Sequence, residues 1–444
     1  MSDLAQGWVW TTLGDASELI RGVTFKKEQA RSSVAPGYSP VLRAGNISTS
    51  LLLDEDLIYV PDEMIHPVQW LSPNDIVLAA SSGSIKVVGK SAALKSSWRG
   101  SFGAFCSVVR PNAAIEPRFL GWFLKSDPVR NRWSEMAKGT NINNLKRDHI
   151  LLTPLPLPPI EEQRRIVDAI EEHLTRIDAA VDSMRRATAQ IGRFRQTSFD
   201  QLFDQTGWKW TTLGEIAEIK GGVTKDAKKQ SNPKFVEVPY LRVANVQRGH
   251  LDLNEVTKIR VPPATLDALR LVVGDILLNE GGDRDKLGRG WVWEGQVENC
   301  IHQNHVFRAR LRDPGMNPRF FSTHANTWGR SWFETNGKQT TNLASISLST
   351  LKMLPVPIPS NEEQALVVAE LERRTSVVDS LLQSLERGSR EAESLRRSIL
   401  AMAFSGRLVP QDPEEEPAGV LLERIRAERD SSPTSRGNSK LVAS

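Results

Sequence analysis

The sequence predicts two related domains of mixed α/β (α+β) structure, each followed by a long helix of the coiled-coil type. Three observations support this fold class: an internal repeat about 200 residues apart, short apolar runs separated by Gly, Pro, Asn and Asp, and a seven-residue apolar repeat in two stretches. With 444 residues, 39% of them hydrophobic and 25% charged, the chain is long enough for two to four domains with cores of their own.

The internal repeat keeps its order along the chain. Residues 7–24 read GWVWTTLGDASELIRGVT and residues 207–224 read GWKWTTLGEIAEIKGGVT, with 11 of 18 positions identical. Further matches follow in step: 40–46 with 239–245, 75–78 with 275–278, and two Pro-x-Pro-x-Pro runs that each lead into Glu-Glu-Gln. A period near 200 residues is too long for a solenoid unit and fits a whole domain plus a connector. Two like domains imply two like binding events.

We expect the first domain over residues 1–160 and the second over 206–360. Short apolar runs such as Pro40–Ile47 and Ile76–Ala80 lie between turn-forming residues, which is typical of strands with a few short helices. Each domain ends in its proline run. Because proline fixes an extended backbone and forbids a helix, we expect this run to be a stiff spacer with a sharp boundary after it.

Two stretches, 161–205 and 361–408, are predicted to be long connector helices. Apolar residues recur every seven positions at Ile170, Ile177, Met184 and Ile191, and again at Leu371, Val378, Leu385, Ala392 and Ile399. A second track comprises Leu174, Ala180, Val181, Ala187 and Phe194 in the first stretch and Leu381, Leu395 and Met402 in the other. Such a repeat specifies a helix that packs along another helix. About 40 helical residues make a rod roughly 60 Å long.

Because the chain has two such helices, an antiparallel pair is the economical arrangement. Two separate amphipathic helices, each lying on its own domain, are the alternative. Asn361 is expected to cap the second helix, with Gln364 completing a capping box. The tail over 409–444 is expected to be mostly disordered, with a short amphipathic helix around 420–425 that could dock on a partner.

Charge and composition narrow the possible functions. Residues 1–160 carry 17 basic and 14 acidic side chains and residues 204–360 carry 21 and 16, whereas the connectors and tail are slightly acidic. The positive charge therefore lies in the repeated domains, where it would attract a polyanion; a plain solvated surface is the alternative. No stretch has the composition of a membrane span or of a signal peptide. The two cysteines, Cys106 and Cys300, do not occupy corresponding positions in the two copies. We expect a cytoplasmic protein without a disulfide framework.

One segment imitates a nucleotide site. Residues 84–91 resemble a phosphate-binding loop, but Ser84 stands where the first glycine is needed. The interior is β-branched, whereas such a loop needs a backbone free to turn its amides inward. A surface strand carrying Lys86 and Lys90 is the better interpretation.

A second segment imitates a metal site. Cys300, His302 and His305 have a spacing that could hold zinc, but a fourth ligand is not evident and the first copy has no equivalent. No metal site and no cofactor are predicted for this chain. Histidines are few and unmatched between the copies, which is poor material for a duplicated acid–base site. We expect the chain to catalyse nothing by itself.

Taken together, these features resemble the DNA specificity subunit of type I restriction-modification enzymes. The likeness is carried by Trp-x-Trp-Thr-Thr-Leu-Gly at 8–14 and 208–214, Leu-Arg to Asn at 42–46 and 241–245, and the proline run into Glu-Glu-Gln in both copies. The end of the second helix over 397–408 and the Pro-Glu-rich tail are similar as well. The resemblance covers nearly the whole chain. One departure is Asn74 in place of Gly274, which leaves open a different turn there.

The resemblance implies two target recognition domains held apart by two long antiparallel helices in a pseudo-two-fold arrangement, each domain reading half of a split sequence in double-stranded DNA. It implies two modification subunits, which bring S-adenosylmethionine and adenine methyl transfer. It also implies restriction subunits, which bring ATP, Mg and cleavage. No membrane is involved. A coiled-coil scaffold or adaptor with two protein-binding domains is the alternative function, and an enzyme in its own right is a third.

Candidate DNA-binding residues are Lys and Arg near loops, which would neutralise phosphates, and Asn and Thr, which would reach base edges. They are Arg43, Asn46, Lys86, Lys90, Lys138, Thr140, Asn141 and Asn143 in the first domain, and Arg242, Asn245, Arg284, Lys286, Lys338, Thr340, Thr341 and Asn342 in the second. The alternative for these loops is that turn residues satisfy their own backbone, and Arg43 and Arg242 could only brace a loop. Residues 81–84 and 279–283 diverge between the copies, so they are candidates for sequence reading, with neutral drift as the alternative.

Overall fold

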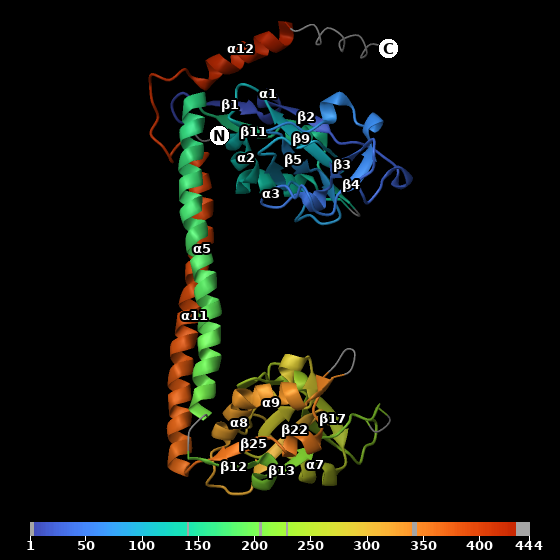
Figure 1. Ribbon diagram of the computed structural model, residues 1–444, viewed down its shortest axis with the longest axis vertical. Coiled ribbons are helices and arrows are strands. Elements are labelled where there is room, and N and C mark those ends of the chain that lie inside the picture. Colours follow the sequence, from blue (N-terminus) through green and yellow to red (C-terminus); the bar gives the residue numbers. More distant parts are fainter. Residues whose placement is uncertain (1–3, 140–141, 204–206, 228–229, 340–343, 432–444) are drawn as a thin grey trace. The chain divides into compact units, whose positions relative to one another are not determined.

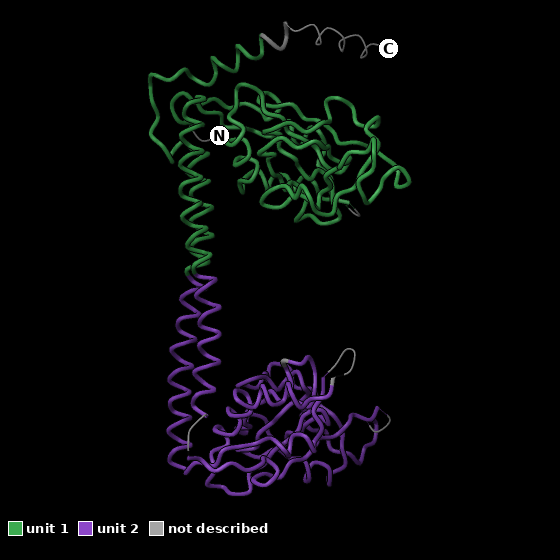
Figure 2. The backbone as a smooth tube through the Cα atoms, in the orientation of Figure 1, with its two compact units in different colours: residues 1–183, 388–444 green, residues 184–387 purple. Residues whose placement is uncertain are grey.

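The computed structural model describes residues 4–139, 142–203, 207–227, 230–339 and 344–431 (Figure 1). The chain forms two compact units, residues 1–183 with 388–444 (unit 1) and residues 184–387 (unit 2), shown in different colours in Figure 2. Each unit holds one domain and part of both long helices, α5 (Ile160–Phe203) and α11 (Asn361–Ala403). Among the described helices, none is both long and apolar enough to span a membrane.

Unit 1 contains one four-stranded and one three-stranded sheet, in the orders β2-β9-β5-β7 and β4-β3-β8, and two strand pairs, β1-β11 and β6-β10. The strands are β1 (Val9–Thr12), β2 (Ser17–Arg21), β3 (Tyr38–Leu42), β4 (Ile58–Pro61), β5 (Ile76–Ala79), β6 (Ser81–Ser82), β7 (Ser91–Ala93), β8 (Ser101–Phe102), β9 (Cys106–Pro111), β10 (Asn143–Asn144) and β11 (Pro154–Leu157). The short helices are α1 (Leu13–Ala16), α2 (Pro117–Lys125), α3 (Asp127–Met136) and α4 (Arg147–Leu151).

Unit 2 repeats this plan with sheets ordered β13-β22-β18-β20 and β17-β14-β21 and the pair β12-β25, and adds β15-β16 and β19-β24-β23. Its strands are β12 (Lys209–Thr212), β13 (Ala217–Gly221), β14 (Val236–Leu241), β15 (Val246–Gln247), β16 (His250–Leu251), β17 (Thr257–Val261), β18 (Ile276–Asn279), β19 (Gly281–Gly282), β20 (Gly290–Val292), β21 (Ile301–His302), β22 (Val306–Leu311), β23 (Lys338–Gln339), β24 (Ala344–Ser345) and β25 (Pro355–Ile358). Its short helices are α6 (Leu213–Ile216), α7 (Pro263–Leu269), α8 (Pro318–Asn326), α9 (Trp328–Asn336) and α10 (Leu348–Lys352). The duplicated α/β fold is therefore confirmed.

The side chains of β5, an inner strand of the four-stranded sheet, point alternately to its two faces, and this alternation explains the layers of unit 1. Ile76 and Leu78 of β5 pack in the same core as α2 and α3, whereas Val77 and Ala79 pack with Leu42 of β3 and Phe102 of β8 in the smaller sheet. Successive side chains of a strand point to opposite faces, so a fully apolar strand can be buried on both sides. The four-stranded sheet thus lies between the two helices and the three-stranded sheet.

The turn before this strand is the same in both copies. Asn74 has φ +73° and Gly274 has φ +93°. Both residues therefore adopt a left-handed conformation, which asparagine tolerates better than other residues with a side chain. The different turn that the substitution left open is not present.

The proline runs are strands rather than the predicted spacers. β11 pairs antiparallel with β1, with Leu155 opposite Thr11 and Leu157 opposite Val9, and β25 pairs with β12 in the same way. Proline has no N–H to donate, so it is tolerated only at an edge, where alternate residues make the ladder hydrogen bonds. The repeated Trp-x-Trp-Thr-Thr motif and the repeated proline motif are therefore partners in one structure.

The long helices pair antiparallel within each unit, which confirms the prediction from the heptads. In unit 1, Ile170 and Ile177 of α5 share a core with Ile399 of α11, and Arg396 forms an ion pair with Asp178. In unit 2, Arg374 of α11 donates from Nη1 to the carbonyl of Ser198 at 2.8 Å.

The first predicted heptad track is buried or half-buried, whereas the second is buried only in part: Leu174 is 3% exposed and Met402 is half-buried against the same core. Ile170, Ile177, Leu371, Val378 and Ile399 are 0–7% exposed, and Met184, Ile191, Leu385 and Ala392 are half-buried. On the second track, Leu381 is 49%, Leu395 50% and Phe194 64% exposed, so their predicted place in the seam is wrong. The helices therefore meet mainly along the first track, and Leu381, Leu395 and Phe194 on the second lie outside the contact.

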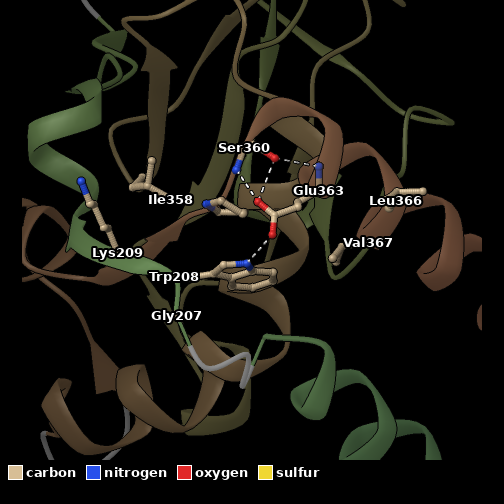
Figure 3. A pocket seen from close by; sticks show the side chains of 9 residues that line it. Gly207, Trp208, Lys209, Ile358, Ser360, Glu363, Leu366 and Val367 are labelled. Carbon is tan, nitrogen blue, oxygen red and sulfur yellow. Dashed lines mark hydrogen bonds between the residues drawn. The ribbon is translucent and has the colours of Figure 1, made fainter.

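The start of α11 is capped one residue earlier than predicted. The backbone N–H of Ser360 donates to Oε2 of Glu363 at 2.8 Å, and the N–H of Glu363 donates back to Oγ of Ser360 at 3.3 Å (Figure 3). The capping box is therefore Ser360 with Glu363, not Asn361 with Gln364. Trp208 Nε1 also donates to Glu363 at 3.2 Å, which joins the opening motif of the domain to the helix (Figure 3).

Gln364 does not cap α11. It joins the helix to its domain through hydrogen bonds. Its Oε1 accepts from the N–H of Asn317 at 2.8 Å and its Nε2 donates to the carbonyl of Pro359 at 3.0 Å. Gln163 in unit 1 does the same with Glu116 and Pro158, at 2.7 and 2.9 Å. The repeated Glu-Glu-Gln motif is thus a structural joint.

The described part of the tail packs on unit 1. In helix α12 (Ala418–Ser431), Ala418 and Leu422 are buried in the core of that unit, and Arg426 forms an ion pair with Asp15 at 3.0 Å. The N–H of Ala418 donates to the carbonyl of Gly7 at 3.0 Å. The short helix therefore docks on its own chain, and residues 432–444, which belong to the predicted disordered tail, lie outside the described residues.

Candidate nucleic-acid interface

Two of the repeated candidates, Asn46 and Asn245, close the turns that follow β3 and β14, the middle strands of the three-stranded sheets. Asn46 is 2% exposed, accepts at Oδ1 from the N–H of Arg43 at 2.8 Å, and donates from Nδ2 to the carbonyl of Glu55 at 2.7 Å. The Arg43 guanidinium pairs with Asp56 at 2.6 Å. Both ends of the amide are therefore occupied by the protein.

The second copy repeats this arrangement. Asn245 accepts from the N–H of Arg242 at 2.8 Å and donates to the carbonyls of Asp252 and Glu255, both at 2.8 Å. Arg242 pairs with the carboxylate of Glu255 at 3.3 Å. Each Arg and Asn pair therefore braces one loop of its own domain. A DNA contact for these four residues stays a prediction.

The structure brings together two candidate segments of the first domain that lie about 60 residues apart in the sequence. β6, in the divergent stretch 81–84, pairs with β10, which follows the candidate loop at Lys138. Asn143 donates from Nδ2 to the carbonyl of Gly83 at 3.2 Å, and Ser81 donates to Asn144. The divergent stretch and the segment that follows Lys138 therefore form one surface.

The second domain places the corresponding segments together as well. β19, in the divergent stretch 279–283, pairs with β24, which pairs with β23 at Lys338. A Cβ at Gly281 would lie 2.9 Å from the carbonyl oxygen of Ala344, so this close pairing needs glycine. The candidates Thr140, Asn141, Thr340, Thr341 and Asn342 lie outside the described residues.

The charged candidates differ between the domains. Lys86, Lys90 and Lys138 are exposed, and none of them forms an ion pair among the residues that the structure describes. In unit 2, Lys286 pairs with Asp283 and Arg284 donates from Nη2 to the carbonyl of Glu334 at 3.1 Å. Lys338 is exposed. The three candidate lysines of the first domain are therefore less neutralised by the protein than Lys286 and Arg284 of the second.

The loop at 84–90 is a turn rather than the surface strand predicted for Lys86 and Lys90. It ends at Gly89, where φ is +77° and a Cβ would lie 2.6 Å from Nη1 of Arg130. That arginine also lies against the loop through Nη2, 3.5 Å from the carbonyl of Lys86. A glycine is favoured here by the left-handed backbone.

The residues with zinc-like spacing have separate partners. The ring Nδ1 of His302 lies 2.6 Å from the carbonyl oxygen of Val306, and that of His305 lies 2.6 Å from Glu280. Cys300 is buried, and burial raises the pKa of its thiol to about 12. Within the described ranges, no three His, Cys, Asp or Glu side chains are grouped to hold a metal ion.

Sequence reasoning missed two half-buried cations beside the loop at 84–90, Lys125 at the end of α2 and Arg130 in α3. Burial lowers the pKa of both side chains. Nothing in the local sequence distinguishes them from the solvated basic residues of other amphipathic helices. Their position becomes evident only when α2 and α3 are placed against β7.

Comparison with known proteins shows which proteins are similar to this chain in sequence and in fold. The family model for the type I restriction modification DNA specificity domain matches residues 5–187. A solved chain from work on complex assembly and conformational transition of the type I R-M system aligns with a TM-score of 0.71 at 20% identity, over 92% of this chain and 100% of that one. The HsdS subunit from Thermoanaerobacter tengcongensis aligns with a TM-score of 0.58 at 20% identity, over 91% and 98%. These structures share the fold.

Two relatives are similar along almost their whole length. The type I restriction enzyme EcoKI specificity subunit of Escherichia coli (strain K12) is 31% identical over 450 residues, and the StySPI specificity subunit of Salmonella potsdam is 32% identical over 451. In both cases the alignment covers 96% of this chain and 96% of the relative. With this identity and coverage, the chain belongs to the DNA specificity subunits of type I restriction enzymes.

Proposed function

We propose that this specificity subunit reads a bipartite DNA sequence, one half with each recognition domain, and directs partner subunits to methylate or cleave there. The observation that carries the proposal is the duplicated loop surface. The same two strand segments meet in both units, β6 with β10 and β19 with β24, but their residues differ, Ser81–Ser82 against Gly281–Gly282. A kept framework with changed loops is what two different half-sites require.

The paired helices supply the second element of the proposal. α5 has 44 residues and α11 has 43, and an uninterrupted helix of that length is about 65 Å long. A rod of this kind would fix the separation of the two readers and so the length of the unread spacer. The pseudo-two-fold arrangement of the domains belongs to the same proposal.

The chemistry is assigned to partners. We expect two modification subunits, with S-adenosylmethionine, and restriction subunits, with ATP and Mg, while this chain contributes recognition and no catalysis in the cytoplasm. The basic recognition domains support DNA as the ligand. Membership of the specificity-subunit family does not favour the alternative of a protein-binding scaffold.

A half-site experiment tests the bipartite proposal. The subunit is assembled with its modification subunits, and adenine methylation is measured on duplexes in which each half of the target is altered separately. Replacing 81–84 and 138–144 of unit 1 by unrelated turn sequences should abolish the requirement for one half and leave the other intact. A variant that loses both requirements together, or neither, would contradict independent reading.

A further inference from the structure

Unit 1 contains a basic cavity between the recognition domain and the paired helices. Its volume is about 660 Å³. Four of its lining side chains are basic, Lys90, Lys125, Arg130 and Arg396, and one is acidic, Asp178. Because Arg396 already forms an ion pair with Asp178, three cations are left without a carboxylate among the described residues.

Two polar groups in the wall of this cavity lack partners. Ser91 is 4% exposed, and its Oγ makes no hydrogen bond within the described part of the chain. Nη1 of Arg130 is buried and also lacks one there. A buried donor without an acceptor costs free energy on the order of 1–3 kcal/mol, so such groups call for an explanation.

Lys125 lines the same cavity, and its ammonium group makes only weak contacts with the protein. Its Nζ donates to the carbonyl of Thr49 at 3.3 Å and lies 5.2 Å from the centre of the Trp122 ring. Burial lowers the pKa of Lys125, and the positive charge of Lys95 adds to that effect. Burial also lowers the pKa of Arg130. The site therefore carries positive charge that the protein does not compensate.

The matching place in unit 2 also holds a cavity, of about 640 Å³ and lined in part by Arg248 and Asn326, but there the backbone of the residue that replaces Ser91 has its partners within the protein. Gly290 opens β20 as Ser91 opens β7, and Asn326 ends α8 as Lys125 ends α2. The Asn326 side chain accepts from the N–H of Gly290 at 3.1 Å and donates to its carbonyl at 2.7 Å. Arg330, which corresponds to Arg130, pairs with Glu334 at 2.9 Å. The open donors of unit 1 are thus not a requirement of the fold.

We propose that the unit 1 cavity binds a phosphate group through Lys90, Ser91, Lys125 and Arg130, and that a backbone phosphate of the bound DNA occupies it. A phosphate oxyanion accepts charge-assisted hydrogen bonds from ammonium, guanidinium and hydroxyl donors, which is the set present. The long Lys and Arg side chains can turn toward the anion. The choice of DNA rests on the proposed function; free inorganic phosphate offers the same chemistry, so the test separates the two.

The first arm measures DNA affinity of the full chain as a function of salt. Each phosphate contact contributes about 0.9 to the slope of log K against log [salt]. Because the cavity takes one phosphate, Lys125→Gln and Arg130→Gln should each weaken binding several-fold at low salt and flatten the slope, by at most about 0.9. Arg330→Gln is the matched control in unit 2 and should change neither. Ser91→Ala, which removes only a hydroxyl, should weaken binding at an unchanged slope and serves if a charge variant fails to fold.

The second arm compares thermal unfolding in phosphate and in chloride at equal ionic strength. A reduced DNA slope in the variants supports the proposal. Unchanged slopes, with phosphate stabilising the unaltered chain more than Lys125→Gln or Arg130→Gln, would overturn DNA as the source. Unchanged slopes without that difference would overturn the site. Failure of the unaltered chain to bind duplex DNA would instead count against the proposed function.

Discussion

Asp75 accepts two hydrogen bonds from Arg110, from Nε and from Nη2, both at 2.7 Å. The carboxylate is buried, and this pairing raises the pKa of the Arg110 guanidinium. Asp275 and Arg310 repeat the pair in unit 2 at 2.7 and 2.8 Å. The aspartate of the Asp-Ile-x-Leu repeat therefore anchors two central strands to each other in each unit.

Removing one member of this pair should be costly. Arg110→Met leaves a buried carboxylate without its partner, and such a loss destabilises a protein by about 3–5 kcal/mol. Denaturant unfolding monitors the change, and Arg176→Met is the control because its pair with Glu172 is exposed and should matter by less than about 1 kcal/mol. Equal effects for the two substitutions would contradict the anchor.

The glutamine joints should act locally. Gln364→Ala removes the acceptor of the Asn317 N–H and leaves the buried carbonyl of Pro359 without that donor, at a cost of about 1–3 kcal/mol. Amide hydrogen exchange should show faster exchange at Asn317 and unchanged protection at Glu116, whose acceptor is Gln163. Gln163→Ala should give the reverse pattern. Uniform change across both units would rule out two separate joints.

Two buried histidines should make unit 2 sensitive to acid. Burial lowers the pKa of His302 and of His324 to about 4, from about 6.5 in the unfolded chain. Both rings are neutral in the folded protein, so their contribution is full above pH 6.5 and is lost as the pH falls toward 4. Each could remove up to about 3 kcal/mol from the free energy of unfolding.

The first unit supplies the control for this pH dependence, because Phe102 and Phe123 stand at the matching places in β8 and α2. His302→Phe and His324→Phe should flatten the fall in stability between pH 6.5 and 4, measured by urea unfolding at several pH values. An unchanged pH profile in both variants would show that other groups cause the acid response.

The C-terminal helix should stabilise unit 1 selectively. Leu422 is 3% exposed in the core of that unit, so Leu422→Ala should cost about 2–4 kcal/mol. Val420 in the same helix is 50% exposed, and Val420→Ala is the matched control with a small effect. Hydrogen exchange at α1 should rise in the first variant and stay constant at α6. Comparable losses from both substitutions would mean that α12 does not dock as described.

The paired lysines test the loop surface. Lys138→Ala and Lys338→Ala should each weaken DNA affinity and flatten its salt dependence, because each would remove one phosphate contact. Affinity of the full chain for duplex DNA at several salt concentrations measures both effects. Unchanged binding in both variants would exclude these lysines from the interface.

Features governed by local chemistry could be predicted from the sequence. The heptads at Ile170 and Leu371 specify long helices in any context, and duplicated motifs require duplicated folds. The capping box lies at Ser360 and Glu363, one residue before the predicted one, because Asn361 and Gln364 offer an equally plausible pattern in the sequence. Local sequence cannot choose between two overlapping candidates; the geometry of the first turn does.

Pairings between distant residues could not be predicted in the same way. The proline run at 154–158 reads as a spacer until β1 lies beside it. The exposure of Leu381 depends on where the partner helix lies, which its own heptad does not specify. The candidate surface shows the same limit: Lys138 was identifiable as a basic loop residue, but Lys125 and Arg130 acquire meaning only once α2 and α3 surround a cavity with β7.

Mapping methylated adenines across the host genome, with this gene intact and deleted, tests the central claim most directly. A subunit that reads two half-sites at a fixed separation predicts one split motif, with a constant unread spacer, that disappears on deletion and returns when the gene is restored. Persistence of every methylated motif after deletion, although the modification subunits are active, would contradict the assignment of DNA specificity to this chain.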